Sequence, residues 1–118
     1  MELEKIREEF CRLAGITLEE CPPYESLVQL GKQEVEQNLM KDVSISGYES
    51  ALEELAAANA YCWYLMFYDN GADKVSVMDV SIEAGRQRKI TQAKQMRQEL
   101  IRMCQGLWKD TDFVFLAT

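Results

Sequence analysis

Residue types that usually carry chemistry are sparse in this chain of 118 residues. It has no histidine, so it lacks the usual general base at neutral pH and the commonest zinc ligand. Two pairs of carboxylates, Glu53 with Glu54 and Asp110 with Asp112, are candidates for proton transfer or cation binding. Neighbouring acids on a helix or loop point in different directions, whereas a hard cation needs several oxygens that converge from one loop. We therefore expect no catalytic residues, no metal and no cofactor, and the sequence does not indicate an enzyme.

Four cysteines stand far apart, at positions 11, 21, 62 and 104. No two of them form the C-x-x-C pair of a metal knuckle or a redox motif. Cys62 and Cys104 lie in apolar helical stretches, so we expect them to be small buried core residues of a protein in a reducing cytoplasm.

Charge is distributed unevenly along the chain. Met1 to Asn59 holds 13 acidic and 5 basic residues, whereas Glu83 to Lys109 holds 2 acidic and 7 basic residues. The net charge of −7 argues against nucleic acid or an anionic membrane as the main partner of the whole surface. Two interpretations remain: the segments face each other within one fold, or the acidic face of one subunit meets the basic face of the next in a head-to-tail ring.

We expect neither a secretory leader nor a membrane span in this sequence. Its first ten residues lack the apolar core of a signal peptide, so secretion is not expected. The longest apolar run, Ala56 to Tyr68, is interrupted by Asn59 and falls short of the ~20 residues that cross a bilayer. We expect this run inside the protein or at an interface.

Helical periodicity dominates the sequence and predicts a single, mainly α domain over residues 1–118, a bundle of four to five helices. The expected helices run from Leu3 to a stop at Gly15, from Pro23 to about Met40, from Gly47 to about Tyr68, and from about Ala84 to Trp108. Thr17 and Glu20 fit a capping box, and Ser46 is the expected N-cap of the third helix.

The third helix is apolar nearly all round, which predicts a central position in the bundle. Its alanines at 56, 57, 58 and 60 permit close approach of neighbouring helices. Gly31, in the second helix, is a candidate for such a close contact.

One stretch, Val75 to Ile82, has the composition of a β-strand. A strand cannot pair its own backbone groups, and each buried group without a partner costs about 1 to 3 kcal/mol. The best partner within the chain is Phe113 to Leu116. We expect a strand-bearing loop or hairpin arm at residues 72–83 and a C-terminal tail at 111–118, which either pair with each other over one end of the bundle or add to strands of neighbouring subunits.

Five segments occur in a recognisable order: E-F-C-R-L-A-G-I, Y-E-S-L-V-Q-L-G-K-Q-E-V, A-A-A-N-A-Y-C-W-Y, V-M-D-V-S-I and R-K-I-T-Q-A-K-Q-M-R-Q-E-L. In the order of these segments and in the pattern of its apolar residues, the chain resembles the small helical head-tail connector, or adaptor, proteins of tailed bacteriophages and prophages. The resemblance implies a non-enzymatic ring between portal and tail through which DNA passes. It also implies contacts with the portal and tail-completion proteins, no membrane, and a location in the host bacterial cytoplasm during assembly and then in the virion.

The surfaces expected to contact other subunits or partners combine charged helix faces with the two strand-like segments. They comprise Glu4, Glu8, Val75, Val77, Met78, Val80, Ile82, Arg86, Arg88, Lys89, Phe113 and Phe115. In a ring lumen, Arg86, Arg88, Lys89 and Lys94 are candidates for sequence-independent, salt-sensitive contact with DNA. The alternative hypothesis is a bacterial helical adaptor or regulatory module that binds another protein through a helical groove and acts as a dimer.

Overall fold

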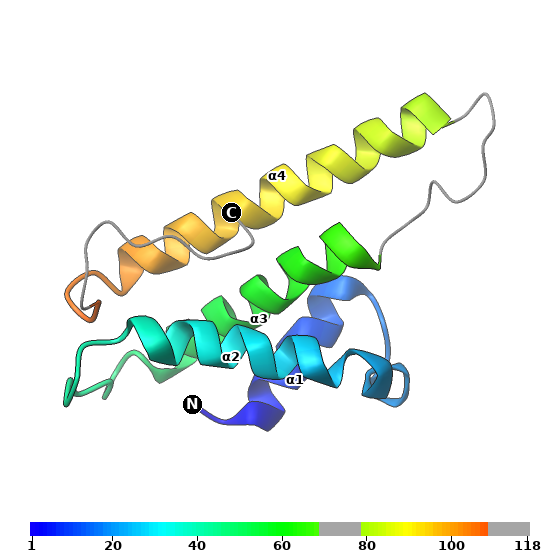
Figure 1. Cartoon of the computed structure of the whole chain (residues 1–118). Helices are drawn as coiled ribbons and strands as arrows, with labels where there is room; N and C mark the ends of the chain where they lie inside the picture. The colour runs from blue at the N-terminus through cyan, green and yellow to red at the C-terminus, as the bar shows by residue number, and fades with distance from the viewer. Residues whose placement is uncertain (69–78, 109–118) are drawn as a thin grey trace.

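The computed structural model describes residues 1–68 and 79–108, and this part of the chain is mainly α-helical, as predicted. Its elements in chain order are α1 (Leu3–Ala14), the 3₁₀ turns η1 (Leu18–Glu20) and η2 (Pro22–Tyr24), α2 (Glu25–Asn38), α3 (Glu49–Phe67) and α4 (Asp79–Met103) (Figure 1). The predicted interface residues Val75, Val77, Met78, Phe113 and Phe115 lie outside the described residues, as does the tail at 111–118.

The connection from α1 to α2 is determined by local signals. Gly15 adopts a left-handed conformation, φ 72°, and its N–H donates to the Cys11 carbonyl, which ends α1. The Thr17 hydroxyl then accepts from the Glu20 N–H at 3.3 Å, and the Glu20 carboxylate accepts from the Thr17 N–H at 2.9 Å. This reciprocal pair confirms the predicted capping box and fixes the direction in which the chain leaves α1.

A bidentate ion pair joins the first two α-helices. Arg7 on α1 donates through two guanidinium nitrogens to the Glu25 carboxylate at the start of α2, at 2.8 and 2.6 Å. Hydrogen bonding to Arg7 holds the pKa of Glu25 below its ordinary value. The pair therefore fixes the angle at which α2 begins.

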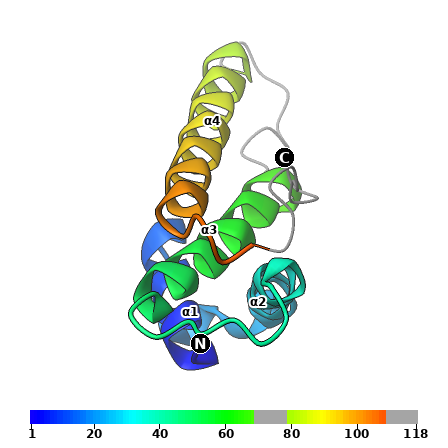
Figure 2. The same ribbon diagram turned by 90° about the vertical axis from the view of Figure 1, so that its left-hand side faces the viewer.

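Helix α3 is the centre of the fold, as its composition predicted. It packs against α1, α2 and α4, which surround it (Figures 1 and 2). Its middle is fully buried on every side, with Leu52, Leu55, Cys62 and the alanines at 56, 57, 58 and 60 all inaccessible to solvent. Small side chains keep the axes of the surrounding helices close, so α3 determines where each neighbour lies.

Helices α2 and α3 approach each other closely at Gly31. A Cβ atom on this glycine would lie 2.3 Å from the carbonyl oxygen of Ala56, a separation that real contacts do not reach. The prediction of a close contact at Gly31 is confirmed, and the reason is the absence of a side chain at this position.

The start of α3 differs from the prediction. The helix begins at Glu49 instead of Gly47, and Tyr48 occupies the N-cap position without a side-chain hydrogen bond. Gly47 has φ 88°, which is incompatible with a helix that begins there. The prediction of Ser46 as the N-cap is therefore wrong, because the chain uses the glycine to turn before the helix starts.

Helix α4 corrects the predicted strand. Its backbone is helical from Asp79, so Asp79 to Ile82 form the first turn of a helix, and the strand prediction is wrong for these four residues. Strand propensity is a weak prior that context overrides, and an acidic residue at the start of a helix is favoured by the helix dipole. The helix also ends at Met103 and not at Trp108, because the chain turns at residues 104–106, where Gly106 has φ 100°.

Helix α4 packs against α3, and no other described helix forms an extended interface with it. Near its C-terminal end, Leu100 and Cys104 join the main core, together with Leu107 and Trp108 beyond the helix. Further toward its N-terminus, Ala93 belongs to a small second cluster with Cys62 and Leu65 of α3. The contact of α4 with the rest of the molecule is thus one-sided and strongest at its C-terminal end.

The end of α4 is also tied to the end of α2. The Met40 N–H donates to the Leu107 carbonyl at 2.8 Å, and Leu39 and Trp108 form an isolated antiparallel β-bridge. The indole N–H of Trp108 donates to the Ile101 carbonyl at 3.0 Å, which holds the turn against its own helix. We call this pairing of residues 39–40 with 107–108 the clasp.

Candidate functional site

An acidic cleft lies between α1 and the first turns of α3. Its volume is about 280 Å³. The lining residues are Lys5, Glu8, Glu9, Ser50, Glu53 and Glu54. Carboxylates make up four of these six side chains, so the acidic segment of the sequence becomes a localised acceptor surface in the folded chain.

Most positive charge near this acidic cleft is already paired within α1. Arg12 forms an ion pair with Glu9, and Lys5 lies 3.8 Å from the carboxylate of Glu2. Glu53 is only 6% exposed, and its Oε2 accepts from the Glu2 N–H at 2.7 Å, which joins α3 to the start of α1. With Glu9 paired and Glu53 buried, Glu8 and Glu54 are the exposed carboxylates that carry the negative charge of the cleft.

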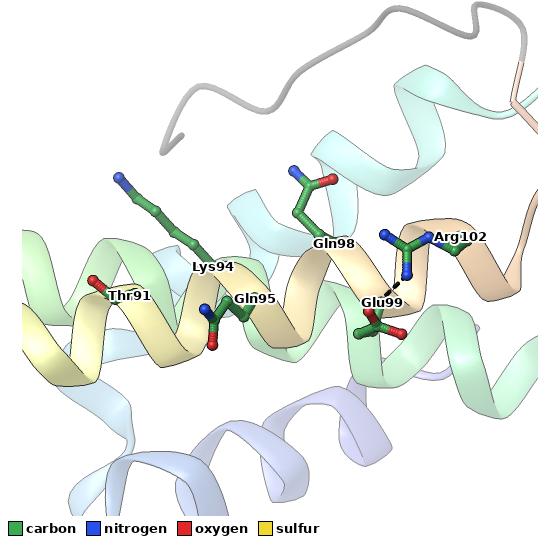
Figure 3. A pocket seen from close by; sticks show the side chains of 6 residues that line it. All are labelled: Thr91, Lys94, Gln95, Gln98, Glu99 and Arg102. Carbon is green, nitrogen blue, oxygen red and sulfur yellow. Dashed lines mark hydrogen bonds and ion pairs between the residues drawn. The ribbon is translucent and has the colours of Figure 1, made fainter.

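A second open groove runs along the outer side of α4. It is lined by Thr91, Lys94, Gln95, Gln98, Glu99 and Arg102, with a volume of about 330 Å³ (Figure 3). Lys94 and Gln98 extend away from the helix, while Arg102 turns toward Glu99 and pairs with it at 2.7 Å. We call this feature the α4 groove.

The charges of the α4 groove and its surroundings are mainly positive. Glu99 is its single carboxylate, against the two cations Lys94 and Arg102. Arg88 and Lys89 are exposed on the same helix, within one turn before Thr91, the first residue of the groove. Together they make the open side of α4 cationic and rich in amide groups.

The structure separates the predicted interface residues into two groups. Glu4 and Glu8 are exposed on α1, whereas Arg88 and Lys89 are exposed on α4. Helices α1 and α4 lie on opposite sides of α3 in both views (Figures 1 and 2). Of the other predicted residues, Val80, Ile82 and Arg86 lie within the span of α4. Glu4 and Glu8 are therefore separated by α3 from Arg88 and Lys89 within one chain.

Sequence reasoning missed a set of buried polar side chains among α2, α3 and α4. Glu34 is 5% exposed, and its Oε1 accepts from the indole N–H of Trp63 at 2.6 Å. Asn59 and Arg97 are completely buried. A tryptophan in an apolar helix needs an acceptor for its N–H, and Glu34 follows Gly31 by three residues on the inward side of α2. These two facts are the signal that could have identified the Glu34–Trp63 pair.

The thiols are buried, as predicted for Cys62 and Cys104. Burial raises the pKa of both, and for Cys62 the positive charges of Arg97 and Lys94 oppose this effect. Burial and a hydrogen bond with Cys21 raise the pKa of Cys11 to about 11. Protonated thiols are poor nucleophiles and poor metal ligands. Within residues 1–68 and 79–108, no three potential ligands among histidine, cysteine, aspartate and glutamate gather where they could hold a metal ion.

Aromatic rings fill the end of α3 that is furthest from the acidic cleft. Tyr64 meets Phe10 of α1 edge-on at 5.8 Å and Tyr24 of η2 at 5.2 Å. Trp63 stacks on Phe67 at 5.2 Å, and Phe67 remains 56% exposed. The rings anchor α1 and η2 to α3 and leave an aromatic edge at the surface.

None of the helices in the described part of the chain is long and apolar enough to span a bilayer.

Comparisons with protein-family models, with curated proteins and with solved structures gave no match to this chain.

Proposed function

We propose that this protein is a non-enzymatic structural subunit of a tailed bacteriophage or prophage, a head-tail connector that oligomerises into a ring between portal and tail and leaves a passage for DNA. One observation carries the proposal: an acidic cleft lies between α1 and α3, an open cationic groove lies on α4, and α3 packs between α1 and α4. The order of sequence segments from Glu9 to Leu100 supports the family assignment.

Opposed charged faces suit a subunit that repeats around a ring. A contact between two different faces is heterologous, so the growing assembly still presents one unused face of each kind after each subunit joins. Association then continues until the rotation closes a ring or extends into a filament. Complementary charge accelerates the encounter and fixes the relative orientation of the subunits.

The proposed partners are further copies of the chain, the portal protein and tail-completion proteins. The proposed locations are the host bacterial cytoplasm during assembly and the virion afterwards. No chemical step is assigned to the chain, because its work in this proposal is to connect two larger assemblies.

Size-exclusion chromatography with light scattering, over a wide range of protein concentration, tests the proposal. We expect the molar mass to rise with concentration beyond a dimer, or to do so once the portal protein is added. A chain that stays monomeric at high concentration and with the portal protein present would rule the proposal out. A complex that stops at two chains would instead favour the dimeric adaptor module.

A further inference from the structure

We infer that the α4 groove of one copy docks onto the acidic cleft between α1 and α3 of the next copy. This inference rests on the proposed function, because it specifies the pair of surfaces through which a self-assembling subunit meets its neighbour.

The α4 groove is built to donate hydrogen bonds. Thr91, Gln95, Gln98 and Arg102 recur at helical spacing along one line of α4. Side-chain amides, a lysine ammonium and a guanidinium all donate, and the charged donors form their strongest hydrogen bonds with carboxylates. Because α4 packs against α3 by one side, this line of donors is open along its length.

The acidic cleft supplies matching acceptors. Glu8 and Glu54 are exposed, and one comes from each of the two helices that form its walls. Ionised carboxylates are acceptors only. When the cationic side of α4 lies across these carboxylates, its donors form hydrogen bonds with the carboxylate acceptors of the acidic cleft.

The occupant of the α4 groove must come from another molecule. Helices α1 and α4 lie on opposite sides of α3, which is packed between them, so the two surfaces of one chain cannot meet (Figure 1). Nucleic acid is the competing polyanion, but the whole chain carries a net charge of −7 and repels a polyanion at long range. A second copy presents the exposed carboxylates of Glu8 and Glu54 at a fixed site.

The pairing predicts strong sensitivity to salt. Charges at an exposed contact are screened over about 8 to 10 Å near physiological ionic strength and over about 3 Å at 1 M. Self-association through these surfaces should therefore weaken steeply as salt is added.

Charge reversal on each surface tests the inference. One variant carries Glu8→Lys and Glu54→Lys, and the other carries Lys94→Glu and Arg102→Glu. Two control variants change the charge by the same amount away from both surfaces: Glu19→Lys with Glu36→Lys, and Lys32→Glu with Lys41→Glu. Circular dichroism checks that each variant remains helical, and light scattering measures its molar mass across concentration.

We expect each surface variant alone to need on the order of tenfold more protein, or greater, to assemble, because like charges then face each other. The controls should assemble like the unmodified chain. An equimolar mixture of the two surface variants should recover assembly, because the reversed acidic cleft of one then meets the reversed α4 groove of the other. Recovery on mixing cannot arise from two variants that have merely unfolded.

Several results would overturn the inference while leaving the proposed function intact. Surface variants that assemble as well as the unmodified chain would show that other surfaces mediate the contact, and so would a mixture that does not recover. Release of the assembled chain by duplex DNA bound to α4 would make this helix a DNA surface. Failure of the unmodified chain to associate, alone or with the portal protein, would overturn the inference and the proposed function together.

Discussion

Gly31 shows how a single residue determines the spacing of two helices. Gly31→Ala places a methyl group against the carbonyl oxygen of Ala56, and the backbones of α2 and α3 must move apart to admit it. Overpacking of this kind costs about 1 to 3 kcal/mol, which exceeds the gain of up to ~1 kcal/mol from replacing a glycine within a helix. We therefore expect the free energy of unfolding to fall, as measured by urea denaturation.

Gly85 provides the matched control for this substitution. It also lies within a helix, α4, but a Cβ atom there meets nothing within 4 Å. Gly85→Ala should therefore raise the free energy of unfolding by up to ~1 kcal/mol. If both substitutions stabilised the protein, α2 and α3 would not approach as closely as the structure has them.

The hydrogen bond between Glu34 and Trp63 is a second feature that depends on individual residues. Trp63→Phe leaves Oε1 of a buried carboxylate without its donor, which costs about 1 to 3 kcal/mol beyond the lost apolar contact. Glu34→Leu leaves the indole N–H without its acceptor. The double variant should lower the free energy of unfolding by less than the sum of the two single variants. The difference, which is the coupling energy of the pair, should be about 1 to 3 kcal/mol in a double-mutant cycle measured by denaturation.

An exposed pair on α4 is the control for this cycle. Glu99 and Arg102 are each about two-thirds exposed, and exposed ion pairs contribute little to stability. Their cycle should show a much smaller coupling. Equal coupling energies in the two cycles would show that Trp63 and Glu34 form hydrogen bonds with water instead of with each other.

At the scale of elements, the sequence predicts best where a residue has a single conformational role. Gly15 ends α1 and Thr17 caps the next turn, as predicted, because both act through neighbouring backbone groups. The central position of α3 also follows from its sequence, since a helix without a polar side must be surrounded. In contrast, the cap predicted at Ser46 depended on where the chain turned, and Gly47 decided that turn.

The first turn of α4 shows why strand propensity failed. Val80 and Ile82 favour strands in isolation, but they form the first turn of a long helix whose later residues pack on α3. Extending an existing helix adds one hydrogen bond for each residue fixed, whereas a strand requires a partner at a distance. The composition of a short segment does not show whether it will extend a neighbouring helix or pair as a strand.

One-sided packing of α4 predicts uneven protection of its amides. Native-state hydrogen exchange should find the slowest amides in α3, around Leu55 to Leu65, since these residues are buried among three helices. Amides near Arg88 should exchange by local opening, orders of magnitude faster, and those near Leu100 should be intermediate because that end joins the main core. Uniform protection along α4 would mean that the helix opens only with the whole molecule.

At the scale of the whole molecule, the sequence predicts two charged segments but not their arrangement. Counting charged residues shows that acidic residues predominate before Asn59 and basic residues after Glu83. Two interpretations fitted those counts equally well. Packing places α3 between α1 and α4, so the exposed acids of α1 and the exposed bases of α4 are separated within one chain. Buried groups such as Arg97 were not predictable either, since they depend on which faces of α2, α3 and α4 come together.

The clasp determines how the molecule carries a mechanical load. Without it, tension applied beyond Trp108 would peel α4 from α3 one turn at a time, starting at the helix end. The hydrogen bond from Met40 to Leu107 and the bridge between Leu39 and Trp108 instead pass that tension into the end of α2. Helix α2 is locked against α3 at Gly31. A pull on the C-terminal end is therefore shared by three helices, and the one-sided helix is not the first to yield.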